Sequence, residues 1–172
     1  PHAKLKTPMN ELTGETCDPL DLFKRAFAEH DAAKFRQLLE RFPVFKARIN
    51  DPVAAFDAPV ITAVRSREML DVLLEAGADI NARSRWWAGG FGLLDSAPPD
   101  LAAYAIQRGA VVDAHAAARL GLLDKLRELV SLDPALVHAR GGDGQTPLHF
   151  ASTVEIAAYL LDLDADIDAR DV

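Results

Sequence analysis

A nine-residue pattern recurs three times in this chain of 172 residues. The segments EAGADINAR at 75–83, QRGAVVDAH at 107–115 and DLDADIDAR at 162–170 align without gaps. Each follows a segment whose apolar residues recur with the period of an α-helix, namely MLDVLL at 69–74, LAAYAI at 101–106 and EIAAYLL at 155–161. Self-similarity of this kind is typical of arrays in which each unit buries its apolar face against the next. The chain is therefore predicted to be a stack of helical repeats.

The residues at the predicted helix ends agree with this interpretation. Gly77 and Gly109 stand where the first two of these helices should end. Glycine is favoured there because the left-handed conformation costs it little. Asp164 takes the same place in the third copy, and aspartate is a weaker but tolerated residue for that conformation.

Two further segments share a longer ending. FRQLLERFPVFKARI at 35–49 and LRELVSLDPALVHAR at 126–140 both run from an amphipathic helix through a proline into Ala-Arg. Around the second segment, apolar residues follow the spacing of one helix face, and they are Leu122, Leu123, Leu126, Leu129 and Val130. This stripe is predicted to be a core face.

The string GQTPLHFA at 144–151 is the most informative in the chain. Thr146 can cap a helix start with its hydroxyl, and Pro147 suits the first helical position, where its missing N–H is not needed. The string resembles the ankyrin repeat, whose signature is a TPLHxA helix start within a period of about 33 residues. The resemblance covers residues 18–172. It implies an all-α solenoid of stacked helix-turn-helix repeats with short hairpin loops.

The resemblance also implies a structural role for His149, because in the family such a histidine ties neighbouring repeats together by hydrogen bonds. Metal ligation is less favoured, since no second histidine or carboxylate stands at a ligand spacing from it.

The predicted repeats are 18–51, 52–83, 84–114, 115–140 and 141–172, after a flexible leader at 1–17. Several depart from the family pattern. APVI at 58–61 and GLLD at 92–95 stand in place of TPLH, and Ser66 lies near a turn that normally carries glycine. The fourth repeat passes from VVDAH almost directly into a helix AAARLG at 116–121, so its hairpin must be clipped.

Charge and cysteine content restrict the class of partner and the compartment. The formal net charge of −7 repels phosphate backbones, so nucleic acid and anionic membranes are poor partners. Cys17 is the single cysteine, which rules out an intrachain disulfide framework and suits a reducing cytoplasm. No stretch approaches the roughly 20 apolar residues that span a bilayer, and the leader lacks the apolar core of a secretory signal.

The motifs of catalysis were not found in the sequence. The five histidines are scattered, and neither HExxH nor CxxC occurs. The alternating aspartates at 162–168 lack the glycine and glutamate of an EF-hand loop, and the glycines around Asp143 are followed by no lysine of a phosphate-binding loop. We therefore expect no catalytic residue, no metal site and no cofactor, although a site assembled by folding stays open at this stage.

The resemblance implies a protein-interaction module that binds a protein or peptide on a concave face made of hairpin tips and inner helices. The alternative is a regulatory or substrate-presenting domain of a larger enzyme that continues beyond Val172. It is motivated by Ile156, Tyr159 and Leu160 on a last helix that no repeat follows. We expect a monomer, with weak self-association through the C-terminal repeat as the other option.

The segment RSRWWAGGFG at 83–92 is the predicted partner-binding site. It holds both tryptophans, and Trp and Arg often dominate binding energy when they are buried at an interface. The predicted binding set is Arg83, Arg85, Trp86, Trp87, Phe91, His115, Arg140 and Asp143. The alternative is that the three aromatic side chains fold back into the core, where this repeat lacks TPLH. A mixed outcome, with one tryptophan anchored and the other exposed, also stays open.

Overall fold

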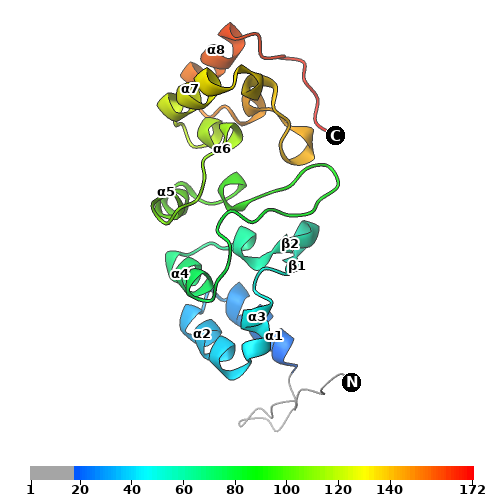
Figure 1. Cartoon of the computed structure of the whole chain (residues 1–172), viewed down its shortest axis with the longest axis vertical. Helices are drawn as coiled ribbons and strands as arrows, with labels where there is room; N and C mark the ends of the chain where they lie inside the picture. The colour runs from blue at the N-terminus through cyan, green and yellow to red at the C-terminus, as the bar shows by residue number, and fades with distance from the viewer. Residues whose placement is uncertain (1–17) are drawn as a thin grey trace. The chain divides into compact units, whose positions relative to one another are not determined.

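The computed structural model describes residues 18–172 (Figure 1), so the predicted leader and Cys17 lie outside the described residues. The described chain is mostly helical and forms two compact units. Unit 1 consists of residues 18–49 and 66–78, and unit 2 consists of residues 50–65 and 79–172. The predicted division into five repeats stays a prediction.

Unit 1 contains the helices α1 (Pro19–Ala28), α2 (Ala32–Arg41), α3 (Pro43–Ala47) and α4 (Arg67–Glu75). Three of them begin at a residue whose side chain accepts a hydrogen bond from a free backbone N–H, as helix starts require. These residues are Asp18, Asp31 and Ser66. Pro43 ends α2 and begins α3, because proline fits a first turn but not a helix interior.

The core of unit 1 is aromatic on one side and aliphatic on the other. The ring of Phe23 meets the ring of Phe35 edge to face, with 5.2 Å between centroids, and lies 4.2 Å from that of Phe45. Met69, Leu70 and other apolar residues of α4 are fully buried, as the predicted helix at 69–74 requires.

Unit 2 begins with a two-stranded antiparallel hairpin of β1 (Pro52–Ala54) and β2 (Ala58–Pro59), in which Pro52 pairs with Pro59. Its α-helices are α5 (Pro99–Gln107), α6 (Ala114–Arg119), α7 (Leu123–Leu132) and α8 (Val154–Asp162). Unit 2 also contains 3-10 helices at Ala55–Asp57, Val60–Ala63, Leu93–Asp95, Pro134–His138, Gly142–Gly144 and Pro147–Phe150. The predicted helices at 101–106 and 155–161 are therefore confirmed.

The left-handed residues that end the repeated helices are also confirmed. Gly77, Gly109 and Asp164 have φ values of 91°, 103° and 61°. The shared backbone conformation explains why glycine recurs at this place and why aspartate can replace it.

The TPLH segment forms a shorter helix than the resemblance implies. Its helix is a single 3-10 turn at Pro147–Phe150, because the next helix, α8, begins only a few residues later. The hydroxyl of Thr153 accepts a hydrogen bond from Ile156 N and begins α8, while the Ser152 amide and hydroxyl both donate to Ala118 O. The helices at APVI and GLLD are also short 3-10 helices, and each is soon followed by an α-helix.

The fourth predicted repeat has its hairpin clipped. α6 begins at Ala114, two residues before the predicted start, because the carboxylate of Asp113 accepts the Ala116 N–H at 2.8 Å. The stretch between α5 and α6 contains no β-strand among the described residues.

The core of unit 2 follows the predicted stripe of α7. Leu126 is fully buried and Val130 is 5% exposed, while the stripe's remaining leucines pack against the same cluster from its edge. Ile156 and Leu160 belong to this cluster and are fully buried. The expectation that they form an uncovered end is therefore wrong, because α8 turns them towards α6 and α7. The exposed apolar residues near the C-terminus are instead Val154, Leu161, Leu163, Ile167 and Val172.

We predict that Leu126→Ala lowers the free energy of unfolding of unit 2 by about 2–5 kcal/mol, because it leaves a cavity among close-packed side chains. Leu132→Ala removes the same atoms from a side chain that is 78% exposed and should change stability by less than about 0.5 kcal/mol. Urea unfolding followed by tryptophan fluorescence measures this, since both tryptophans lie in unit 2. Equal effects of the two changes would contradict the packing of α7.

Candidate interaction surface

The loop at 84–92 is closed at its neck by hydrogen bonds. Ser84 N donates to Phe91 O at 2.8 Å, and Phe91 N donates to the Ser84 hydroxyl at 2.9 Å. The Arg83 guanidinium donates to Gly90 O at 2.7 Å. The loop therefore leaves and re-enters unit 2 at one place, and its central residues project from a fixed base (Figure 1).

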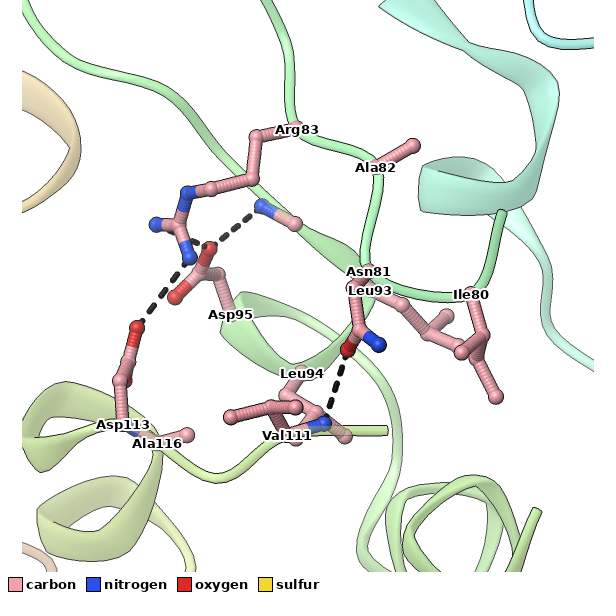
Figure 2. A pocket seen from close by; sticks show the side chains of 11 residues that line it. Ile80, Asn81, Ala82, Arg83, Leu93, Leu94, Asp95, Val111, Asp113 and Ala116 are labelled. Atoms are coloured by element: carbon pink, nitrogen blue, oxygen red, sulfur yellow. Dashed lines mark hydrogen bonds and ion pairs between the residues drawn. The ribbon is translucent and has the colours of Figure 1, made fainter. Parts of the chain in front are cut away.

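Arg83 is engaged beneath the loop. Its guanidinium forms ion pairs with Asp95 and Asp113, each at 3.1 Å (Figure 2). The cavity beside it has a volume of about 30 Å³, far below the roughly 300 Å³ of a small-molecule site. This placement gives Arg83 a structural role and does not support its predicted contact with a partner.

The carboxylate of Asp95 explains how GLLD replaces TPLH. It accepts a hydrogen bond from Gly92 N, the residue three positions earlier. His149 does the same in TPLH, where its Nδ1 accepts the Thr146 N–H at 3.1 Å. Among the hydrogen bonds of the described chain, those of His149 stay inside its own turn, so the expected tie to a neighbouring repeat is not found.

Arg119 of α6 holds the other end of the GLLD turn. Its guanidinium donates to Leu94 O at 2.8 Å and to Ala97 O at 2.7 Å. Burial lowers the pKa of Arg119, and the nearby charge of Asp95 acts in the opposite direction. The base of the loop is therefore fixed from both sides.

Trp86 is anchored by a residue far along the chain. Its indole Nε1 donates to Asp143 Oδ1 at 2.9 Å, and its ring meets Phe56 edge to face with 5.0 Å between centroids. The indole is half-buried, so it neither fills the core nor stands free in solvent.

The rest of the loop packs on the turn at 141–144. The ring of Phe91 lies so close to Gly142 that a Cβ atom there would overlap it. Gly144 N donates to Ala88 O at 3.1 Å. A ring contact and a main-chain hydrogen bond therefore join the loop to this turn.

Trp87 projects outward from this base. It is 75% exposed, and its ring centroid lies 5.8 Å from that of Trp86. One tryptophan is thus anchored and the other exposed, which is the mixed outcome left open by the sequence.

Phe56 was missed by the sequence analysis. It lies at the tip between β1 and β2 with a φ of 61°, and it is 54% exposed. The adjacent Asp57 O accepts a hydrogen bond from Arg85 N at 3.2 Å, which joins this tip to the loop. The sequence did offer one signal: Phe56 is a large aromatic residue in a turn just before APVI, and no predicted core face includes it. We call Phe56, Trp86, Trp87 and Phe91 the aromatic surface.

Two further members of the predicted set also form hydrogen bonds with other residues of unit 2. His115 is 7% exposed, and its Nε2 donates to Ala139 O at 3.1 Å and Gln145 O at 3.0 Å. Arg140 donates to Gly144 O and Arg170 O, both at 2.7 Å. The ring of His115 is thus buried against main-chain carbonyls, and Arg140 holds the turn that supports the loop.

Arg85 differs from these residues. Its side chain is exposed, and its guanidinium has no hydrogen bond or ion pair with any residue in 18–172. The structure therefore brings together Arg85, Trp86, Trp87, Phe91 and Asp143 from the predicted set, and it adds Phe56.

No group of three or more His, Cys, Asp or Glu side chains within 18–172 is arranged to hold a metal ion. In this part of the chain, every helix is too short or too polar to cross a bilayer.

We predict that Trp86→Phe lowers the free energy of unfolding by about 1.5–3 kcal/mol, because it keeps an aromatic ring but removes the hydrogen bond to a charged carboxylate. Trp87→Phe is the matched control and should change stability by less than about 0.5 kcal/mol. Thermal and urea unfolding followed by circular dichroism compares the two. If Trp87→Phe destabilises the chain as much, Trp86 is not the anchor.

Comparison with known proteins gives two findings. Residues 143–172 match the family description "Ankyrin repeat". A stretch of 49 residues is 45% identical to "Serine/threonine-protein kinase VIK" of Arabidopsis thaliana and covers 27% of this chain. The match spans only 11% of the kinase.

Proposed function

We propose that this chain, whose residues 143–172 match the ankyrin repeat family, uses the aromatic surface of unit 2 to bind a protein or peptide partner. Ankyrin repeats generally mediate protein–protein interaction. The observation that carries the proposal is the exposure of Trp87 and Phe56, at 75% and 54%, on a loop and a hairpin tip. Hairpin tips form part of the face that the family resemblance implies for binding.

The support beneath the aromatic surface favours binding over accidental exposure. Trp86 is held by Asp143, and Phe91 packs on Gly142. Side chains that are already ordered lose less entropy when a partner binds. Phe56, Trp86 and Trp87 form contiguous ring pairs, whereas a single exposed apolar residue needs no functional explanation.

Arg85 completes the surface. Its guanidinium can donate up to five hydrogen bonds, and nothing in residues 18–172 occupies it. Tryptophan and arginine are enriched among the residues that contribute most to binding at protein interfaces. Neither Arg85 nor the tryptophans act as catalytic residues in this proposal.

The test is capture of binding proteins from cell lysate on the immobilised chain, compared among the parent, Trp87→Ala and Leu132→Ala. Trp87→Ala should lose the captured partner, with an affinity at least about 30-fold weaker once the partner is purified, because truncation of a central aromatic costs about 2 kcal/mol or more. Leu132→Ala removes another exposed apolar side chain and should retain the partner.

Both variants should melt within about one degree of the parent, since neither side chain is buried. Capture that survives Trp87→Ala unchanged would contradict the proposed site and direct the search to another face of the repeats.

The match to the kinase favours a second candidate function. A repeat segment of this kind would then regulate a larger enzyme or present substrates to it, while the chemistry resides elsewhere in the polypeptide. The complete reading frame of the gene tests this candidate. A catalytic domain in the same polypeptide would support it, and a frame without one would contradict it.

Two properties of the isolated chain belong to the same proposal. We expect it to be monomeric, with any weak self-association arising from the exposed Val154 and Ile167 at the C-terminal repeat. A cytoplasmic location fits its single cysteine, because proteins of oxidising compartments more often rely on disulfides.

A further inference from the structure

The net charge of the chain is concentrated in the unit that carries the aromatic surface. The described residues of unit 1 contain eight Lys and Arg and eight Asp and Glu, so their formal charges cancel. Unit 2 contains nine Lys and Arg against 16 Asp and Glu, which gives a formal charge of −7. A field of this sign raises the local concentration of cationic segments and repels acidic ones.

Carboxylates also lie beside the aromatic rings themselves. Asp143 contacts the Trp86 indole through Oδ1. Asp57 follows Phe56 in the hairpin tip, and its side chain is exposed without a hydrogen bond or ion pair inside 18–172. Neither carboxylate is neutralised by an ion pair with a described residue, so both can attract a cation at the aromatic surface.

The rings supply a second attraction for a cation. Lys and Arg side chains bind over aromatic faces through the ring quadrupole, and tryptophan is the strongest of the aromatic residues in this respect. Trp87, at 75% exposed, is accessible for such stacking. Arg or Lys stems also cover apolar surface with their methylene groups.

We propose that the aromatic surface binds a basic segment of its partner, with a Lys or Arg side chain stacked on Trp87 and drawn by Asp57 and Asp143. This inference rests on the proposed function and names the partner's chemistry. An acidic segment would be attracted by Arg85, whose guanidinium has no partner among residues 18–172, but repelled by these two carboxylates and by the charge of unit 2.

Arg85 makes the proposal specific. Its guanidinium repels a cation placed next to it and so opposes the attraction of Asp57 and Asp143. The guanidinium can then donate to main-chain carbonyls of the bound segment. Replacing Arg85 by glutamine keeps a side-chain N–H donor but removes the positive charge, so it should strengthen binding of a basic segment, whereas a purely apolar contact would be insensitive to it.

The first experiment selects peptides from a random 12-residue phage library on the full chain, with the Trp87→Ala chain as the counter-selection. Peptides that depend on Trp87 should be enriched in Lys and Arg and depleted in Asp and Glu. Because Trp87→Ala should melt like the parent, loss of these peptides reports the surface and not unfolding.

The second experiment measures the affinity of the most enriched peptide by fluorescence anisotropy. Asp57→Asn should weaken it about three- to tenfold, Arg85→Gln should strengthen it about two- to fivefold, and both effects should shrink at high salt. Asp100→Asn neutralises an acidic residue elsewhere in unit 2 and should change the affinity by less than about twofold.

The outcomes distinguish failure of the basic-segment inference from failure of the proposed binding function. Acidic or uncharged peptides that still depend on Trp87 would overturn the inference and leave the proposed function standing. A gain of affinity in Asp57→Asn together with a loss of affinity in Arg85→Gln would have the same meaning. If no enriched peptide depends on Trp87, both the inference and the peptide-binding form of the proposed function fail.

Discussion

The hydrogen bond from Trp86 to Asp143 joins residues that lie 57 positions apart in the chain, and the exposed part of the aromatic surface depends on it. It fixes one indole at the base of a nine-residue loop, so that Trp87 can project without the loop collapsing. Phe91 on Gly142 and the Ala88–Gly144 backbone hydrogen bond strengthen the same junction.

The repeats tolerate divergence because different residues perform one local task at each helix start. Thr146 with His149, Gly92 with Asp95, and Asp113 with Ala116 all satisfy a backbone N–H within the first turn. An imidazole nitrogen and a carboxylate oxygen are both acceptors, so histidine can be exchanged for aspartate without losing the turn. The aspartate at GLLD then becomes available to pair with Arg83, which ties the turn to the neck of the loop.

Unit 2 carries both the aromatic surface and the negative formal charge of the chain. The loop and the hairpin tip contribute the rings, the turn at 141–144 contributes the anchoring carboxylate, and the unit as a whole carries the formal charge of the chain. A surface of this composition favours a partner that presents both apolar area and positive charge. Lysine and arginine provide both in one side chain, which is the physical basis of the proposed partner chemistry.

The sequence by itself determined the properties that depend on near neighbours. The helical periods at 69–74, 101–106 and 155–161, the left-handed Gly77 and Gly109, and the buried stripe of α7 all follow from spacing within a few residues, and the structure confirms them. Only the tertiary structure decided which polar and aromatic side chains remain available. His115 and Arg140 donate hydrogen bonds to carbonyls of the turn at 139–145. Phe56 joins the aromatic surface from the hairpin of β1 and β2. Spacing along the chain does not encode these contacts, because each depends on where the backbone of a distant segment passes.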